Sequence, residues 1–160
     1  MDTTRRSVTV GGTPPYSPHI TCSPRWKLRD YLELGALPTA PGSARGHVGN
    51  VLRDWRLYEF IDAVQMVVTE LITNSVAATR AINWQQSVPA VRVWLLADPA
   101  SVLVAAWDAA PGIPRGRKAG QDDESGRGLA IVDALSAEWN CYRCAAPDGG
   151  KVTWALIDTP

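Results

Sequence analysis

Two polar residues in one long, mainly apolar segment are the first candidates for chemistry. Glu70 and Asn74 are four positions apart, so in a helix they stack on the same side. Apolar residues spaced three and four apart predict a helix from Tyr58 to about Thr79, and both polar side chains fall just outside one edge of its apolar face. A carboxylate and a carboxamide at such a border can line a cleft beside a sheet. An ordinary solvated helix edge is the alternative.

A third polar residue, Asp108, ends an apolar segment that alternation predicts to be a strand. The alternation places its carboxylate on the face of Val104 and Ala106, opposite Trp107. At a strand end, an aspartate can simply start a turn before the following proline and glycine residues. It can also accept a hydrogen bond from an amino group of a ligand held under the helices.

A pair of glycines opens the helix that is predicted near residue 126, after a loop rich in proline, glycine and charge. The sequence there is Gly126-Arg127-Gly128-Leu129. Glycines at this place let a phosphate approach exposed backbone N–H groups at the positive end of the helix dipole. Such pairs also occur in loops by chance, so this one gains weight from its place in the loop that follows Asp108.

Hydrophobic periodicity and turn signals predict the elements that would position these residues. Strands are expected at Tyr31–Leu37, Val91–Ala97, Ser101–Asp108, Glu138–Cys144 and Lys151–Ile157. Helices are expected at Ala44–Trp55 with Thr39 as the N-cap, at Tyr58–Thr79, and from Gly126 through Leu135. This order predicts an α+β two-layer sandwich, in which one mixed, mostly antiparallel sheet carries its helices on one face.

Length and composition are typical of a single globular domain with a core. The chain has 160 residues, of which 46% are hydrophobic and 20% are charged. Its 16 Lys and Arg residues balance 16 Asp and Glu residues, which argues against direct nucleic-acid binding as the main role. The sequence has neither an apolar run long enough to span a membrane nor the apolar segment of a signal peptide, so we expect a cytoplasmic protein without membrane contact.

Residues 1–28 are predicted to be a largely disordered tail, and residues 29–160 the folded domain, because the tail is rich in Gly and Pro and lacks apolar periodicity. Trp94, Trp107 and Trp154 are expected on the sheet face away from the helices if their strands share one sheet. An apolar face of that size needs a cover. Either the segment around Tyr16–Trp26 or a second subunit in a homodimer would supply it, and separate coverage of each ring by its strand neighbours is the alternative.

Three cysteines, Cys22, Cys141 and Cys144, allow two interpretations. A cytosolic protein keeps its thiols reduced, which argues against a disulfide framework. The Cys-x-x-Cys spacing, together with His19 and Cys22, would supply four ligands of the kinds that zinc prefers. We favour the simpler interpretation, in which Cys141 and Cys144 are small hydrophobic residues of a strand and the other two belong to an unrelated tail.

Taken together, the candidate motifs resemble those of the histidine kinase-like ATPase (GHKL) superfamily, which has the Bergerat ATP-binding fold. The motifs are Glu70-Leu-Ile-Thr-Asn74, Trp107-Asp-Ala-Ala-Pro-Gly-Ile-Pro114 and Gly126-Arg-Gly-Leu-Ala-Ile-Val-Asp-Ala-Leu-Ser136. They occur in the family's order. The similarity covers about residues 30–158 and is greatest to small anti-sigma-factor serine/threonine kinase-like ATP-binding proteins.

The resemblance implies that three of the candidates act on ATP and Mg²⁺. Glu70 would polarise the attacking nucleophile, here a hydroxyl of a partner protein. Asn74 would hold the Mg²⁺ that bridges the ATP phosphates. Asp108 would accept a hydrogen bond from the adenine amino group. Phosphoryl transfer depends mainly on such positioning and on charge stabilisation.

The resemblance also assigns the loop and its glycines. Gly112 belongs to the same motif as Asp108, and residues 113–125 correspond to a mobile lid over ATP. Gly126, Arg127, Gly128 and Leu129 correspond to the second glycine motif, which lies under the phosphates.

Three positions depart from the family's pattern. Ala78 stands where a His often follows the motif's asparagine by four residues. Ala110 stands where the adenine motif often has Gly or Ser. Lys151 follows Gly150 at a position where a Thr commonly helps to hold adenine through water.

Two functions are therefore expected. The first is an ATP-dependent serine/threonine protein kinase of the anti-sigma, partner-switching type, which phosphorylates a small antagonist protein and sequesters a sigma factor. The second is a binding module in which ATP or ADP gates a protein partner through the lid, with negligible turnover.

Overall fold

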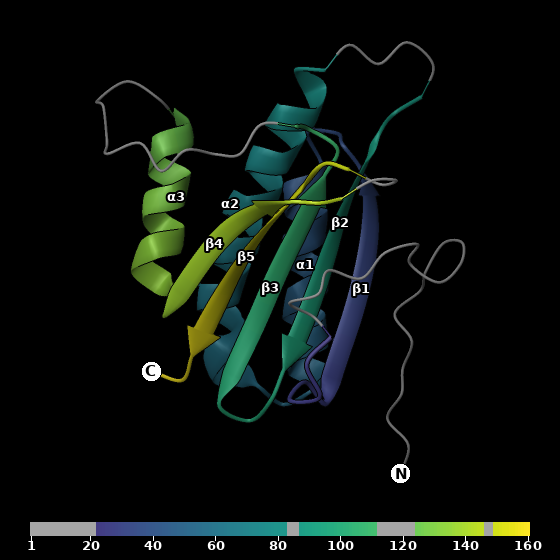
Figure 1. Ribbon diagram of the computed structural model, residues 1–160. Coiled ribbons are helices and arrows are strands. Elements are labelled where there is room, and N and C mark those ends of the chain that lie inside the picture. Colours follow the sequence, from purple (N-terminus) through teal and green to yellow (C-terminus); the bar gives the residue numbers. More distant parts are fainter. Residues whose placement is uncertain (1–21, 83–86, 112–123, 146–148) are drawn as a thin grey trace.

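The structure is a computed structural model that describes residues 22–82, 87–111, 124–145 and 149–160 (Figure 1). Its elements are, in chain order, β1 (Leu28–Gly35), α1 (Ala40–Asp54), the short 3₁₀ helix η2 (Tyr58–Phe60), α2 (Ile61–Arg80), β2 (Ala90–Ala97), β3 (Ser101–Asp108), α3 (Glu124–Leu135), β4 (Glu138–Arg143) and β5 (Lys151–Asp158).

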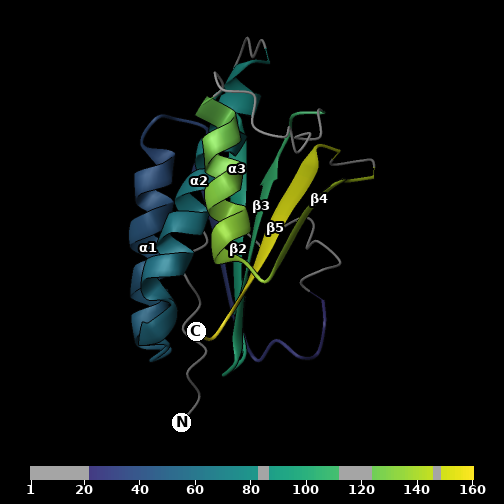
Figure 2. The ribbon, with the colours of Figure 1, turned by 90° about the vertical axis from the view of Figure 1, so that its left-hand side faces the viewer.

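The five strands form one sheet in the order β1-β2-β3-β5-β4, and each neighbouring pair is antiparallel. Figure 2 shows α1, α2 and α3 together on one side of this sheet. The predicted α+β two-layer sandwich is therefore confirmed, and the described strand pairs are antiparallel throughout. The last strand, β5, lies between β3 and β4, so the end of the chain is placed in the interior of the sheet.

Several element boundaries differ from the prediction, and the first residues of the helix predicted from Tyr58 form the separate 3₁₀ helix η2. The first strand begins at Leu28 and ends at Gly35, because its eight residues all pair with β2. Helix α1 begins at Ala40 after Thr39, which occupies the N-cap position without making a side-chain cap hydrogen bond. Helix α3 begins at Glu124, two residues before the predicted start.

The main core lies between the helices and the sheet. Helix α2 presents an apolar face that includes Val64, Leu71 and Ile72, all fully buried, and it packs on β3 through residues such as Val104. The stretch Tyr58–Arg80 is long and apolar enough to cross a membrane, but its buried face is explained by this packing. The periodicity that predicted the helix therefore reflects its central place in the core.

The opposite face of the sheet carries a second apolar cluster. Trp94 and Trp107 are buried there with Ala105 and Val152, and Trp154 packs against them. The pairing of Trp94 with Ala105, and of Ala105 with Trp154, places the first and last of these indoles in one row across three strands. The prediction that the three tryptophans share this face is confirmed.

The segment before β1 covers part of this second face. Trp26 is buried against Leu96 and Leu103, which belong to β2 and β3. Thus the part of the predicted tail that the structure describes, from Cys22 onward, contributes a core residue. Tyr16 and the rest of residues 1–21 lie outside the described residues.

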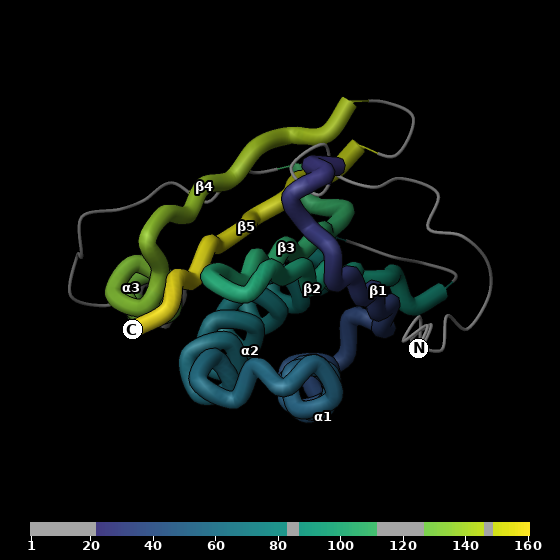
Figure 3. Tube along the Cα trace, turned by 90° about the horizontal axis from the view of Figure 1, so that it is seen from below, coloured from purple at the N-terminus to yellow at the C-terminus, as the bar shows by residue number. Residues whose placement is uncertain are grey.

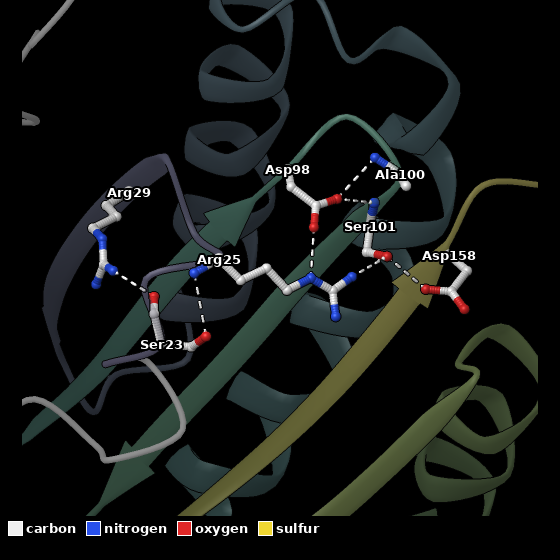
Figure 4. A network of polar contacts seen from close by, with 7 residues as sticks. All are labelled: Ser23, Arg25, Arg29, Asp98, Ala100, Ser101 and Asp158. Carbon is white, nitrogen blue, oxygen red and sulfur yellow. Dashed lines mark hydrogen bonds and ion pairs between the residues drawn. The ribbon is translucent and has the colours of Figure 1, made fainter.

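A polar network beside Trp26 ties this segment to the sheet (Figure 4). The Arg25 guanidinium donates to Asp98 Oδ2 at 2.5 Å and to Ser101 Oγ at 2.7 Å. Ser101 Oγ in turn donates to Asp158 Oδ1 at 2.7 Å. The contacts join the segment before β1, the β2–β3 turn with the start of β3, and the end of β5, so the network connects three stretches that are distant in sequence.

Candidate functional site

The predicted site residues come from α2, the end of β3 and the first turns of α3. Figures 2 and 3 show α3 beside α2, on the same side of the sheet. The side chains of Glu70 and Asn74 are half-buried on α2, at the edge of its apolar face, as the periodicity predicted. Asp108 is the last residue of β3 and is almost completely buried.

Gly128 brings the second glycine motif into contact with α2. A Cβ atom at Gly128 would lie 2.5 Å from Glu70 Oε2 and 3.7 Å from Asn74 Nδ2. The first of these distances is too short for a real contact, so an added methyl group at Gly128 would displace the end of the Glu70 side chain. Two motifs that are more than fifty residues apart in sequence therefore meet in space.

The glycine motif lies two residues deeper in its helix than predicted. Because α3 begins at Glu124, Gly128 follows the four residues whose backbone N–H groups lack intrahelical partners. Gly128 thus contributes space for Glu70 more than a free N–H group. Arg127 is exposed and Leu129 is half-buried; Gly112 and the lid residues up to 123 lie outside the described residues.

Asp108 accepts two hydrogen bonds and lies beside a third polar side chain. Lys151 Nζ donates to its Oδ1 at 2.6 Å, the Ala110 backbone N–H donates to the same oxygen at 3.0 Å, and Ser75 of α2 lies beside the carboxylate. The carboxylate caps the turn after β3, as the first interpretation of the sequence predicted, and it faces the helices; its acceptance of a ligand's amino group stays a prediction. Burial raises the pKa of Asp108 above its ordinary value, and the hydrogen bond and charge of Lys151 oppose that rise.

Lys151 also belongs to the site. The sequence alone indicated this residue only as a departure from the family's pattern. It is the residue of β5 that pairs with Asp108, and only 4% of its surface is exposed. Gly150, at φ +72°, turns the chain into β5; a Cβ there would collide with the carbonyl oxygen of Asp108. From the sequence, Lys151 could be placed only at the start of a predicted strand. The register between β3 and β5, which pairs it with Asp108, could not be deduced.

The two cysteines of the Cys-x-x-Cys segment lie on opposite faces of the sheet. Cys141 Sγ accepts a 3.4 Å hydrogen bond from Thr153 Oγ1, and burial raises the pKa of this thiol. Cys144 packs instead with the tryptophan cluster. Together they do not form half of a zinc site, and within the described ranges no group of three or more His, Cys, Asp or Glu side chains is close enough to hold a metal ion. His19 lies outside those ranges.

Comparison with known proteins gives one positive result. The model of a family described as the histidine kinase-like ATPase domain matches residues 35–156, which is most of the chain. The matched region contains Glu70, Asn74, Asp108 and Gly128. A search of curated proteins finds no match.

The contact between Gly128 and Glu70 predicts the effect of one added methyl group. Gly128→Ala should remain folded, because the opposing atom is the end of a flexible side chain, and its free energy of unfolding should change by less than about 1 kcal/mol. The Glu70 carboxylate should move, which the ¹³C shift of its Cδ would report. Gly46→Ala on α1 is the control, since a Cβ there meets nothing within 4 Å. An unmoved Glu70 signal in Gly128→Ala would contradict the contact.

The buried ion pair predicts a stability difference that depends on pH. Lys151→Met leaves the Asp108 carboxylate buried without its cation, and should lower the free energy of unfolding by about 3 kcal/mol at pH 7. The folded-state pKa of Asp108, already raised, rises further in this variant. The loss should therefore be smaller at pH 5, where protonation of Asp108 in the folded state is more favourable.

Urea denaturation at the two pH values measures this difference. Asp108→Asn/Lys151→Met is the control, because it removes both charges and retains a side-chain oxygen for the Ala110 N–H group. It should recover most of the stability. Equal losses at pH 5 and pH 7, or no recovery in the double variant, would show that charge burial is not the cause.

Proposed function

The chain belongs to the histidine kinase-like ATPase family, whose domains bind ATP, generally with Mg²⁺, and we propose that it is an ATP-dependent serine/threonine protein kinase of the anti-sigma, partner-switching type. It would act in the cytoplasm on a protein antagonist and bind a sigma factor, either alone or as a homodimer. The observation that carries this proposal is the contact of the Glu70–Asn74 pair with Gly128.

The residues present fit ATP at two places. At the base end, Asp108 is a buried carboxylate that accepts from Lys151 and the Ala110 N–H group, and a carboxylate has about four lone-pair sites, so acceptor capacity remains for an amino group. At the phosphate end, the side-chain oxygen of Asn74 is a ligand of the kind that Mg²⁺ prefers. When bound with ATP, Mg²⁺ neutralises charge on the phosphates.

The residues around Gly128 have separate tasks in this proposal. Glu70 orients the hydroxyl group of the partner's serine or threonine and accepts its proton, and Gly128 leaves its carboxylate room to do so. Asn74, one helical turn further along α2, would hold the metal ion through its carboxamide oxygen. The backbone N–H groups at the start of α3 provide donors for the phosphates. Helix α2 connects these groups to the base end, since Ser75 contacts Asp108.

A second candidate function is a protein-binding module gated by ATP or ADP, with negligible turnover. The Asp108–Lys151 ion pair favours it, because a nucleotide must join or rearrange an interaction that already exists. Such a rearrangement is suited to a switch between two states. The two functions share the nucleotide and differ in whether phosphate is transferred.

Substitutions on α2 should separate binding from transfer. Glu70→Ala should keep the affinity for Mg·ATP within about tenfold and reduce phosphotransfer by about a hundredfold or more, since Glu70 acts on the nucleophile. Asn74→Ala should weaken both, because the metal also neutralises the phosphates in the ground state. Calorimetric titration measures the affinity, and transfer from γ-³²P-ATP to purified antagonist proteins of the partner-switching type measures the activity.

Exposed residues of the same types provide matched controls. Glu59→Ala and Asn50→Ala should behave like the parent protein in both assays, because both side chains are exposed and far from the site in sequence. Parent-like transfer by Glu70→Ala would exclude the kinase proposal and favour the gated module. Absence of ATP binding would exclude both.

A further inference from the structure

The ion pair between Asp108 and Lys151 places a hydrogen-bond acceptor beside a hydrogen-bond donor at the base end of the site. The two residues are register partners in β3 and β5, so their side chains emerge side by side on one face of the sheet. Asp108 alternates with Trp107, which lies on the far face, and shares its own face with Val104 and Ala106 of the main core, so this face is the one under the helices. Both residues are buried, with 1% of Asp108 and 4% of Lys151 exposed.

The Lys151 ammonium has donor capacity beyond the ion pair. An ammonium carries three N–H bonds, and the structure records one hydrogen bond from Nζ within the described part of the chain, the one to Asp108. Burying further N–H bonds without acceptors is costly. A ligand that offers an acceptor atom beside Asp108 would therefore satisfy this group.

The adenine edge has the complementary pattern. Its exocyclic amino group is a donor, and the adjacent ring nitrogen, N1, is an acceptor. In the proposed function, Asp108 accepts a hydrogen bond from this amino group. We propose that Lys151 donates a hydrogen bond to N1, so that the ion pair recognises two neighbouring atoms of the base. Lys151 is then a specificity-determining residue, and its charge makes this hydrogen bond stronger than one from a neutral donor.

The backbone holds Lys151 at the position from which, in this proposal, its side chain donates to N1. Gly150 allows the chain to pass against the Asp108 carbonyl, and Lys151 is the first residue of β5, paired with β3 from there to Asp158. The contact with Asp108 then holds the flexible side chain in one direction. Since little has to be reorganised on binding, the entropic cost of ordering Lys151 is already met by the fold.

Nucleotide analogues test this proposal on the unmodified protein. Calorimetric titrations with the Mg²⁺ complexes of ATP and 1-deaza-ATP, in which a C–H group replaces N1, measure the contribution of that one acceptor. The analogue should bind about 10- to 100-fold more weakly, as expected for a hydrogen bond to a charged donor. 7-deaza-ATP, altered on the other ring, is the control and should bind within a few-fold of ATP.

Lys151→Met assigns the effect to the lysine. In this variant ATP and 1-deaza-ATP should bind with affinities equal to within about threefold, because the donor to N1 is missing, and thermal melting shows whether the variant is folded. If that variant does not fold, the same comparison in Lys151→Gln, which keeps a shorter and neutral donor, should show a preference for ATP well below that of the parent.

The outcomes separate this proposal from the proposed function. Equal binding of ATP and 1-deaza-ATP by the parent protein would overturn the role of Lys151 while leaving ATP binding intact. An undiminished preference in a folded Lys151 variant would do the same. GTP binding as tight as ATP would also overturn it, because the pair would then be reading the guanine edge. If neither ATP nor its analogues bind, the proposed function itself fails.

Discussion

A buried charge needs a partner, and this constraint organises the site. Asp108 loses nearly all contact with water at the end of β3, and Lys151 supplies the opposite charge from the first position of β5. The pairing requires the register between these strands and a glycine at position 150, where a side chain would collide with the backbone of β3. Ser75 extends the same group of contacts to α2. The helix that carries Glu70 and Asn74 is thereby connected to the sheet at the site.

Much of the fold could be predicted from the sequence, because its signals are local. The limits of β3 follow from turn residues on both sides, and the helix over residues 61–80 follows from apolar residues spaced three and four apart. The start of β1 at Leu28 could not be predicted, since it is set by pairing with β2 rather than by alternation within the strand. The position of β5 between β3 and β4 likewise depends on pairing between segments, which no local pattern shows.

The same distinction between local and non-local signals applies to the residues of the site. Glu70, Asn74, Asp108 and Gly128 belong to short motifs and could be selected by type and spacing, but their proximity depends on how the helices pack. Lys151 could not be assigned, because no local pattern shows which residue of one strand faces which residue of another. The expected role of Gly128 also changes, because α3 begins two residues earlier than predicted. With α3 starting at Glu124, the glycine makes room for Glu70 instead of opening the helix.

The most direct measurement is a calorimetric titration of the full chain and of Asp108→Asn with Mg·ATP, with thermal melting to establish that the variant is folded. If Asp108 accepts from the adenine amino group, the asparagine variant presents an amide that can donate where an acceptor is needed, and it should lose about 2–4 kcal/mol of binding free energy. Equal affinities in the two proteins would remove Asp108 from base recognition. No heat of binding with the parent protein up to high micromolar ATP would contradict the assignment of this site to a nucleotide.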